Sequence, residues 1–179
     1  MLATVSAFLA GVDSKSGEGS TFWLTVCLKK PTGEQSSSPL REGADAEKLL
    51  RQFYHGQRVL VVDDEMLNVE IAKIFLEDCG LEIDSAEDGL QAIAMAQKTA
   101  YSAILMDMQM PNLDGLGATR LIRELPGYRA TPIVAITANA FSENRDRCLA
   151  AGMNDFLVKP FTPEALFDIL LRWLILRSE

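Results

Sequence analysis

Uninterrupted apolar runs, each followed at once by polar residues, recur along the chain from residue 58 onward. Four of them lie within Arg58–Val62, Ala103–Met106, Pro132–Ile136 and Asp155–Val158. Runs of this length that end at polar or turn-forming residues are typical of strands buried in a parallel sheet. A fifth strand is expected over Leu81–Ser85.

Stretches with helical periodicity separate these expected strands. Helices are predicted at about Met66–Cys79, from about Asp88, over a segment that includes Gly117–Leu125, at about Ser142–Ala151, and from Thr162 onward. Gly80 suits a helix end, because glycine tolerates the left-handed conformation, and Thr162 before Pro163 suits a helix start. The side chains expected to face the core are Leu90, Ile93, Ala94, Ala118, Leu121, Ile122, Leu125, Leu166, Ile169, Leu170, Trp173 and Leu174.

The alternation of strands and helices from Gln57 onward predicts an α/β fold with a doubly wound, five-stranded parallel sheet. In open α/β sheets, ligands bind at the carboxyl ends of the strands. The polar residues at those ends are Asp63, Asp64, Asp107, Thr137 and Lys159. Acids, a hydroxyl and an amine are therefore expected to converge on one edge of the sheet, with Asp107 on the central strand.

These side chains have the composition of a phosphoryl-transfer site. Carboxylates held within several ångströms repel one another, and a hard divalent cation such as Mg²⁺ removes that conflict while keeping waters for an incoming phosphate. Lys159 and Thr137 suit phosphoryl oxygens. Asp107, placed between these groups, is the candidate carboxylate nucleophile. Alignment and charge neutralisation are most of what phosphoryl transfer requires.

Residues 57–177 resemble the receiver domain of response regulators, which has a flavodoxin-like fold. The matching motifs are Val62-Asp63-Asp64, the run from Met106 to Pro111 with Asp114-Gly115, Ile136-Thr137-Ala138, and Lys159-Pro160. Their order and spacing together make the resemblance specific.

The resemblance implies a role for each acid of the set. Asp107 is the phosphoacceptor, and Asp64, Asp107 and the backbone carbonyl of Gln109 bind Mg²⁺. Asp63 holds the metal through water. Gln109 and Asn139 fall where the family tunes the lifetime of the aspartyl phosphate.

The resemblance also implies the phosphoryl ligands and a switch. Thr137 and Lys159 bind the phosphoryl group, and the Lys159–Pro160 peptide bond is expected to be cis. Phe156 matches the aromatic switch position that moves with Thr137. Phe156 lacks the hydroxyl of the tyrosine that is common at this position. Whether a hydrogen bond at this position reports the phosphorylated state is therefore left open.

Two other functions use part of the same residue set. Phosphatases of the haloacid dehalogenase type combine a nucleophilic Asp with Mg²⁺ and Lys, and their motif has the form Asp-x-Asp. In this chain the second acidic position of that motif is occupied by Gln109, which cannot act as a general acid or base. A passive divalent-ion site needs only the acids and leaves Thr137 and Lys159 unexplained. A stable, acid-resistant adduct on Asp107 after exposure to a small phosphodonor with Mg²⁺ is expected only for the receiver.

Residues 1–30 do not have the composition of a complete domain. Thr21–Leu28 is expected to form a strand after a Gly- and Ser-rich turn. Gly11–Ser14 and Gly17–Trp23 resemble the last glycine box and closing strand of a histidine-kinase ATP-binding domain, so this segment is interpreted as a truncated remnant without kinase activity. A stray β-hairpin arm is the alternative. His55, the single histidine, precedes a strand and is not on a helix where a kinase presents its phosphoacceptor histidine.

Residues 31–56 have linker composition, rich in Pro, Gly, Ser and scattered acids. A short helix is expected over Ala46–Tyr54, with Leu49, Leu50 and Phe53 on one side. Its packing partner, the neighbouring domain or another protein, is left open. The expected organisation is a remnant at 1–30, a linker at 31–56 and a receiver domain at 57–177.

Composition excludes several function classes. A net charge of −8 and a pI near 4.7 argue against a nucleic-acid surface. Cys27, Cys79 and Cys148 lack CxxC spacing, which indicates neither a disulfide framework nor a zinc site and fits a reducing, cytoplasmic setting. The apolar segment Met1–Gly11 is too short to span a bilayer and lacks a basic start, so neither a signal peptide nor a transmembrane segment is expected.

The kinase-like segment favours an origin as the C-terminal part of a hybrid sensor histidine kinase. The expected partners are a histidine kinase as phosphodonor and a histidine phosphotransfer protein as acceptor. A free-standing response regulator is the alternative. Phe167, Leu171 and Ile175 form a second apolar stripe on the last expected helix, and this stripe is either covered by the linker or a surface for a homodimer or another partner.

Overall fold

The computed structural model describes residues 5–15, 19–28, 44–138 and 142–177. The chain divides into two compact units, Met1–Ser38 and Pro39–Glu179. The first unit contains an antiparallel hairpin of β1 (Val5–Lys15) and β2 (Gly19–Leu28). The strand predicted at Thr21 therefore begins at Gly19, and it pairs along its length with β1. The strand β1 was not predicted, and a hairpin was expected only under the alternative interpretation of this segment as a β-hairpin arm.

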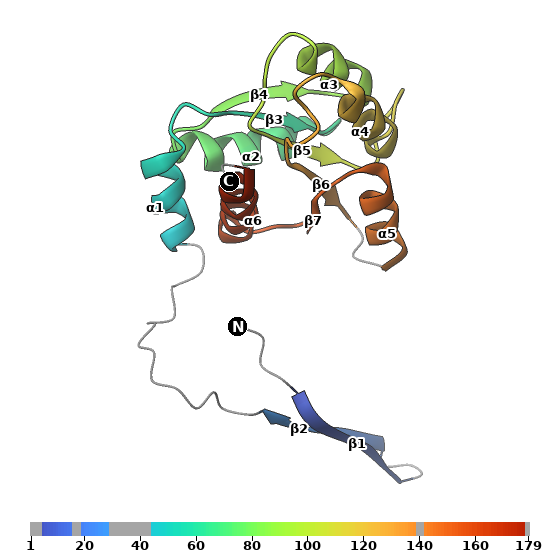
Figure 1. Cartoon of the computed structure of the whole chain (residues 1–179). Coiled ribbons are helices and arrows are strands. Elements are labelled where there is room, and N and C mark those ends of the chain that lie inside the picture. Colours follow the sequence, from blue (N-terminus) through green and yellow to red (C-terminus); the bar gives the residue numbers. More distant parts are fainter. Residues whose placement is uncertain (1–4, 16–18, 29–43, 139–141, 178–179) are drawn as a thin grey trace. The chain divides into compact units, whose positions relative to one another are not determined.

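The second unit is an α/β domain whose parallel strands have the order β4-β3-β5-β6-β7 (Figure 1). The strands are β3 (Arg58–Val62), β4 (Glu82–Ala86), β5 (Ala103–Asp107), β6 (Ile133–Thr137) and β7 (Asp155–Val158). The helices are α1 (Ala44–Phe53), α2 (Met66–Asp78), α3 (Gly89–Ala96), α4 (Gly115–Glu124), α5 (Ser142–Ala151) and α6 (Pro163–Arg177). The predicted doubly wound, five-stranded parallel fold is confirmed.

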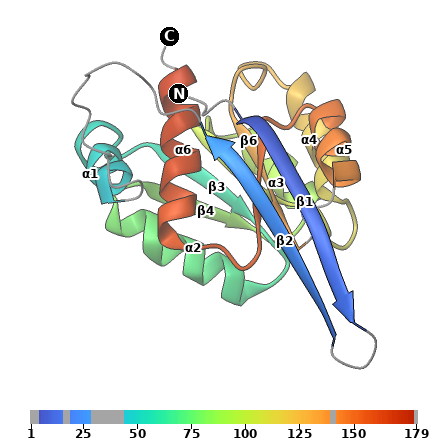
Figure 2. The same cartoon turned by 90° about the horizontal axis from the view of Figure 1, so that it is seen from below.

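Helices cover both faces of the sheet, and each face has its own apolar core. Residues of α1, α2 and α6 form one core, and α6 lies in front of the strands in Figure 2. Residues of α3, α4 and α5 form the other core. Every residue of β5 and β6 is buried, as expected for continuous apolar runs in the middle of a parallel sheet.

A glycine and several polar side chains mark the ends of these helices. Gly80, with a φ of +79°, follows the end of α2, as its sequence position predicted. Asp88 and Asp114 cap α3 and α4, because their carboxylates accept the N–H groups of Gln91 and Gly117. The Thr162 hydroxyl oxygen accepts the N–H of Ala165, 3.3 Å away, at the start of α6.

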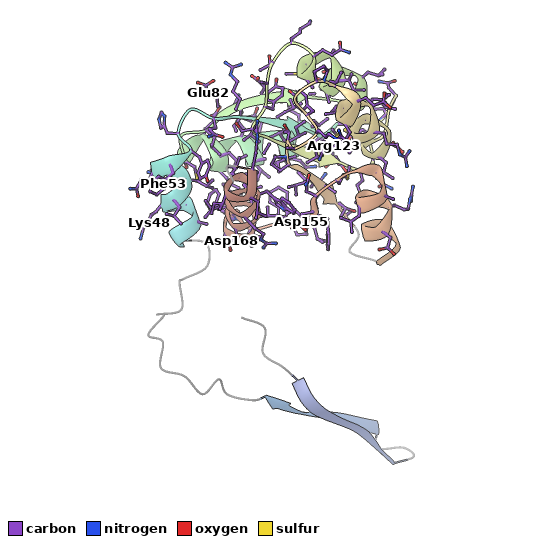
Figure 3. The ribbon with its side chains drawn as sticks, in the orientation of Figure 1. Lys48, Phe53, Glu82, Arg123, Asp155 and Asp168 are labelled. Carbon is purple, nitrogen blue, oxygen red and sulfur yellow. The ribbon has the colours of Figure 1, made fainter. Side chains whose placement is uncertain are left out.

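Arg123 of α4, labelled in Figure 3, donates hydrogen bonds to the loops that lead into β6 and β7. Its guanidinium donates to the carbonyl oxygens of Gly152 at 2.8 Å and Thr131 at 2.6 Å, and to Asn154 Oδ1 at 2.7 Å. Burial lowers the pKa of Arg123. The group acts as a polar clamp that satisfies carbonyl oxygens of those loops.

The faces of α3 and α4 differ in part from the prediction. Leu90, Ala94 and Leu121 are exposed, whereas the buried residues of α3 are Gly89, Ala92 and Ala96. The two helices approach so closely that a Cβ at Gly89 would lie 2.8 Å from the Cβ of Ala118. Small residues therefore occupy this interface, and Leu90 and Leu121 point outward. Ile93, Ala118, Ile122 and Leu125 lie in or against the core, as predicted, so the predicted faces are wrong only in part.

The α1 and α6 helices pack against each other. Leu50 is fully buried, but Leu49 and Phe53 are 37% and 64% exposed, so the predicted face of α1 is wrong in part. On α6, Phe167 is buried in the same core as Leu50, whereas Ile175 is exposed. The second stripe is therefore partly covered within this unit. Among the described residues, no helix is long and apolar enough to cross a bilayer.

Candidate active site

The predicted site residues lie together at the carboxyl edge of the sheet. Asp63 and Asp64 follow β3, Asp107 and Thr137 close β5 and β6, and Lys159 follows β7. Because β3 and β5 are neighbours where the strand order reverses, their acids meet. One carboxylate oxygen from each of Asp63, Asp64 and Asp107 lies within 4.8 Å of the others.

Lys159 neutralises part of this acidic cluster. Its Nζ donates to Asp63 Oδ2 and to Asp107 Oδ2, both at 2.6 Å. Burial lowers the pKa of Lys159, but these two hydrogen bonds and the charges of the two carboxylates outweigh that effect, so its pKa lies above the ordinary value. The ammonium therefore stays charged at neutral pH.

Further hydrogen bonds fix the two buried acids. Asp63 Oδ1 accepts from the backbone N–H of Glu65 at 3.0 Å and from Asn68 Nδ2 at 3.1 Å. Asp107 Oδ1 accepts from the backbone N–H of Gln109 at 3.1 Å. Asn68 was not predicted as a site residue. The feature of the sequence that could have identified it is its position in the first turn of the helix that follows Asp63.

The loop after Asp107 is held close to the strand end. A Cβ on Gly115 would lie 2.0 Å from the backbone carbonyl oxygen of Asp107, so only glycine fits at this approach. Asn112, with a φ of +62°, donates its Nδ2 to Asp88 Oδ2 at 2.7 Å and ties the loop to the start of α3. After β7, the Lys159–Pro160 bond is cis, as the resemblance to receiver domains implied.

The acidic cluster fits Mg²⁺ by donor type and spacing. Mg²⁺ takes oxygen ligands at about 2.1 Å in octahedral geometry, which places them roughly 3 to 4 Å apart. The carboxylate oxygens of the cluster lie within 4.8 Å of one another, close to that range. Asp64 is exposed, which leaves room for the waters that Mg²⁺ retains.

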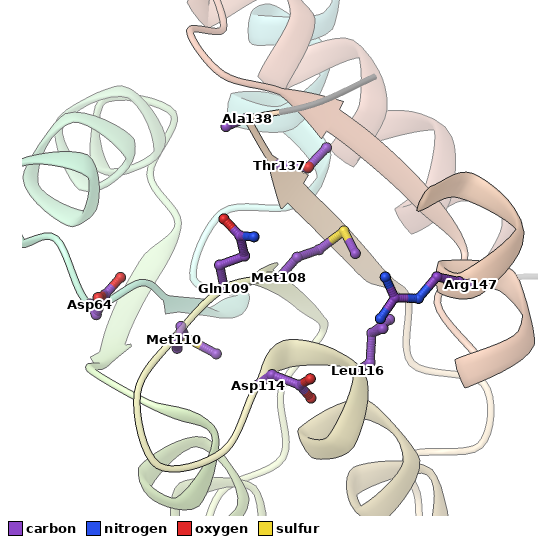
Figure 4. A pocket seen from close by; sticks show the side chains of 9 residues that line it. All are labelled: Asp64, Met108, Gln109, Met110, Asp114, Leu116, Thr137, Ala138 and Arg147. Carbon is purple, nitrogen blue, oxygen red and sulfur yellow. The ribbon is translucent and has the colours of Figure 1, made fainter. Parts of the chain in front are cut away.

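A pocket of about 750 Å³ opens beside the acids (Figure 4). Its lining residues are Asp64, Met108, Gln109, Met110, Asp114, Leu116, Thr137, Ala138 and Arg147. Thr137 is buried, and Phe156 is half-buried against the core beneath this part of the sheet. Arg147, on α5, was not predicted, since an arginine in a polar helix carries no signal of a site.

Comparisons with known proteins agree with this geometry. Residues 59–171 match the family model described as the response regulator receiver domain. The chain is 40% identical over 115 residues to the signal transduction histidine-protein kinase BarA of Shigella flexneri, covering 64% of this chain and 12% of that protein. It is 35% identical over 162 residues to the autoinducer 2 sensor kinase/phosphatase LuxQ of Vibrio vulnificus, covering 90% and 18%. The chain thus spans a small part of these curated relatives.

Solved structures show the same similarity. The receiver domain of sensor histidine kinase PA1611 from Pseudomonas aeruginosa PAO1, which has a magnesium ion coordinated in its active-site cleft, is 44% identical with a TM-score of 0.63. The match covers 66% of this chain and 98% of that one. The chemotaxis protein CheY4 of Vibrio cholerae is 35% identical with a TM-score of 0.64, covering 65% and 98%.

Proposed function

Because this chain belongs to the response regulator receiver family, we propose that it acts in phosphorelay signalling by accepting a phosphoryl group on Asp107. The observation that most directly supports this is the position of Lys159 Nζ, 2.6 Å from Asp107 Oδ2. The same carboxylate lies in a cluster of acids that fits a divalent cation. A positioned carboxylate between an ammonium and a cation site is what phosphoryl transfer needs.

In the proposed reaction, a carboxylate oxygen of Asp107 forms a bond to phosphorus while the bond from phosphorus to the donor nitrogen breaks. The electron pair of that bond goes to the imidazole of a phosphohistidine donor. The Lys159 ammonium and the Thr137 hydroxyl donate hydrogen bonds to the phosphoryl oxygens. Onward transfer to another histidine, or hydrolysis by water, frees Asp107 again.

Mg²⁺ is the proposed cofactor. Asp64, Asp107 and the backbone carbonyl of Gln109 would hold it, with Asp63 acting through water. When bound, the ion supplies charge neutralisation between the carboxylates and the phosphoryl oxygens. The magnesium in the cleft of the PA1611 receiver supports this choice.

We propose that Thr137 and Phe156 form the conformational switch. They lie on the neighbouring strands β6 and β7, where Thr137 pairs with Val158 and Phe156 pairs with Ala135. Phe156 has no hydroxyl, so its part in the switch rests on packing. Gln109 is proposed to tune the lifetime of the phosphorylated state, and Asn139, proposed for the same role, lies outside the described residues.

For the larger protein we propose a hybrid sensor histidine kinase of cytoplasmic location. Residues 1–30 would be a remnant of its ATP-binding domain, 31–56 a linker and 57–177 the receiver. The partners would be a histidine kinase and a histidine phosphotransfer protein. The sensor kinases among the relatives support this proposal. A free-standing regulator is the second candidate, because the chemotaxis protein CheY4 is among the similar solved structures.

Phosphorylation of the full chain tests the proposal. With Mg²⁺ and a small phosphodonor or a phosphorylated histidine phosphotransfer protein, intact-mass measurement is expected to show one added phosphoryl group, and peptide mapping to place it on Asp107. Chelation of Mg²⁺ and the Asp107→Asn variant should each abolish the addition. Asp78→Asn, at the exposed end of α2, serves as the matched control and should be labelled normally. Normal labelling of Asp107→Asn would refute the proposal.

A further inference from the structure

We propose that Arg147 is a specificity-determining residue of this site, which favours small acyl phosphates as donors by stabilising their anionic leaving group. The proposal rests on the proposed phosphorylation of Asp107. Its starting point is the volume of the pocket, about 750 Å³, which is more than a phosphoryl group alone needs. Pockets of about 300–1,000 Å³ hold whole small-molecule ligands.

The pocket places a cation beyond the phosphoryl-binding residues. Thr137 and Asp64 line it near the acidic cluster, and Arg147 enters it from α5, beside Leu116 (Figure 4). Asp107 is only 7% exposed, so the body of a donor that reaches it has to lie outside the cluster. The pocket beside Asp64 and Thr137 provides that space, with an arginine at its wall.

Arg147 is available to an anion. Among the described residues that line the pocket it is the single cation, and the acids are Asp64 and Asp114. Asp114 is already engaged, since it accepts the N–H of Gly117 at 2.7 Å. Within the described part of the chain, the Arg147 side chain has no hydrogen bond or ion pair. In a chain of net charge −8, the positive charge of such an arginine attracts a carboxylate to this part of the surface.

The charge of the leaving group decides how strongly the positive charge of Arg147 affects the rate of phosphorylation. When acetyl phosphate phosphorylates Asp107, the new bond joins a carboxylate oxygen of Asp107 to phosphorus, and the bond from phosphorus to the acyl oxygen breaks. Its electron pair leaves on acetate, which becomes an anion in the pocket. Phosphoramidate instead releases neutral ammonia. A guanidinium beside the leaving group therefore lowers the barrier for the first donor more than for the second.

The test compares the two donors on the full chain with Mg²⁺. Rate constants for phosphorylation by acetyl phosphate and by phosphoramidate are measured for the unaltered chain, Arg147→Gln, Arg147→Lys and the control Arg129→Gln. Arg129 is an exposed arginine before β6, at the opposite edge of the sheet. The phosphoramidate rate also shows that each variant is folded and has an active site.

For Arg147→Gln, the ratio of the acetyl phosphate rate to the phosphoramidate rate is expected to fall by about three- to tenfold. Arg147→Lys should restore most of that ratio, because it keeps the charge, and Arg129→Gln should leave it unchanged. An unchanged ratio for Arg147→Gln would overturn the proposal while leaving phosphorylation of Asp107 intact. Failure of both donors to phosphorylate the unaltered chain would instead overturn the proposed function and this inference together.

Discussion

Lys159 and the proposed metal ion compete for the same carboxylates, because the ammonium lies 2.6 Å from both Asp63 and Asp107. Replacing Lys159 by Met removes a positive charge that repels Mg²⁺ and frees both oxygens. We expect Lys159→Met to bind Mg²⁺ about tenfold more tightly, since a charge a few ångströms from a divalent ion is worth on the order of 1 kcal/mol in a partly solvated site. The same variant should lose most phosphorylation, because no amine then contacts the phosphoryl group.

Isothermal titration with Mg²⁺ measures the affinity, and intact mass measures the phosphorylation. Lys98→Met is the control, because Lys98 is exposed and follows α3. Weaker binding of Mg²⁺ by Lys159→Met would show that the lysine orders the carboxylates for the metal and does not compete with it.

The thiol of Cys79 is expected to be unreactive in the folded chain. Burial raises its pKa to about 11, and the nearby charge of Glu47 acts in the same direction. At about pH 8, raising the thiol pKa from 9.0 to about 11 lowers the fraction of reactive thiolate by about 100-fold. Since the raised pKa favours the protonated thiol in the fold, its contribution to stability is complete below the ordinary thiol pKa. It is lost as the pH rises toward 11.

Alkylation with iodoacetamide checks this prediction. Peptide mapping should show Cys79 modified far more slowly in the native chain than after unfolding in guanidinium, with the protection decreasing as the pH is raised. Cys148 is expected to behave alike, because burial also raises its pKa. Rapid modification of Cys79 under native conditions would contradict the burial on which the prediction depends.

Five site residues were predictable from sequence because strand ends determine where they lie. A run such as Ala103–Met106 fixes the strand, and the parallel sheet then brings Asp107, Asp63 and Lys159 to one edge. Asn68 and Arg147 reach the site from helices instead. Their approach depends on how each helix is rotated about its axis, and apolar periodicity does not fix that rotation finely enough for a single polar side chain.

At the scale of elements, helix faces were harder to predict than helix positions. The α5 helix has the predicted bounds, Ser142–Ala151, because start and stop signals are local. In α3, the residues at the core are glycine and alanine, so close packing of backbones decides the face and side-chain size misleads. In α1, the small Ala46 and the large Leu50 are both buried whereas Phe53 is exposed, so side-chain size alone does not identify the buried face there either.

The face of α1 gives a prediction with a matched control on adjacent residues. Leu50 is fully buried and Leu49 is 37% exposed. Leu50→Ala should lower the free energy of unfolding by about 2–5 kcal/mol, as expected when a core leucine is removed. Leu49→Ala should cost less than about 1 kcal/mol. Equilibrium urea denaturation measures both, and equal effects would mean that α1 does not pack through Leu50.

At the scale of the whole molecule, the folded unit that carries the site extends beyond the match to the receiver family. That match begins at residue 59, yet α1 starts at Ala44 and contributes Leu50 to the core shared by α2 and α6. All the described core residues lie between Ala46 and Leu174. The second unit therefore contains both of its cores and the candidate site.

Two truncated chains test where this unit begins. A chain of residues 39–179 is expected to unfold with the same free energy as the full chain, within about 0.5 kcal/mol, because every described core contact is retained. A chain of residues 57–179 should lose at least about 2 kcal/mol, since removing α1 uncovers the apolar surface that Leu50 and Ala46 bury. Urea denaturation and phosphorylation of Asp107 are measured on all three chains. Equal stability of the two truncated chains would show that α1 is a dispensable part of the linker, and a large loss in 39–179 would show that Met1–Ser38 supports the second unit.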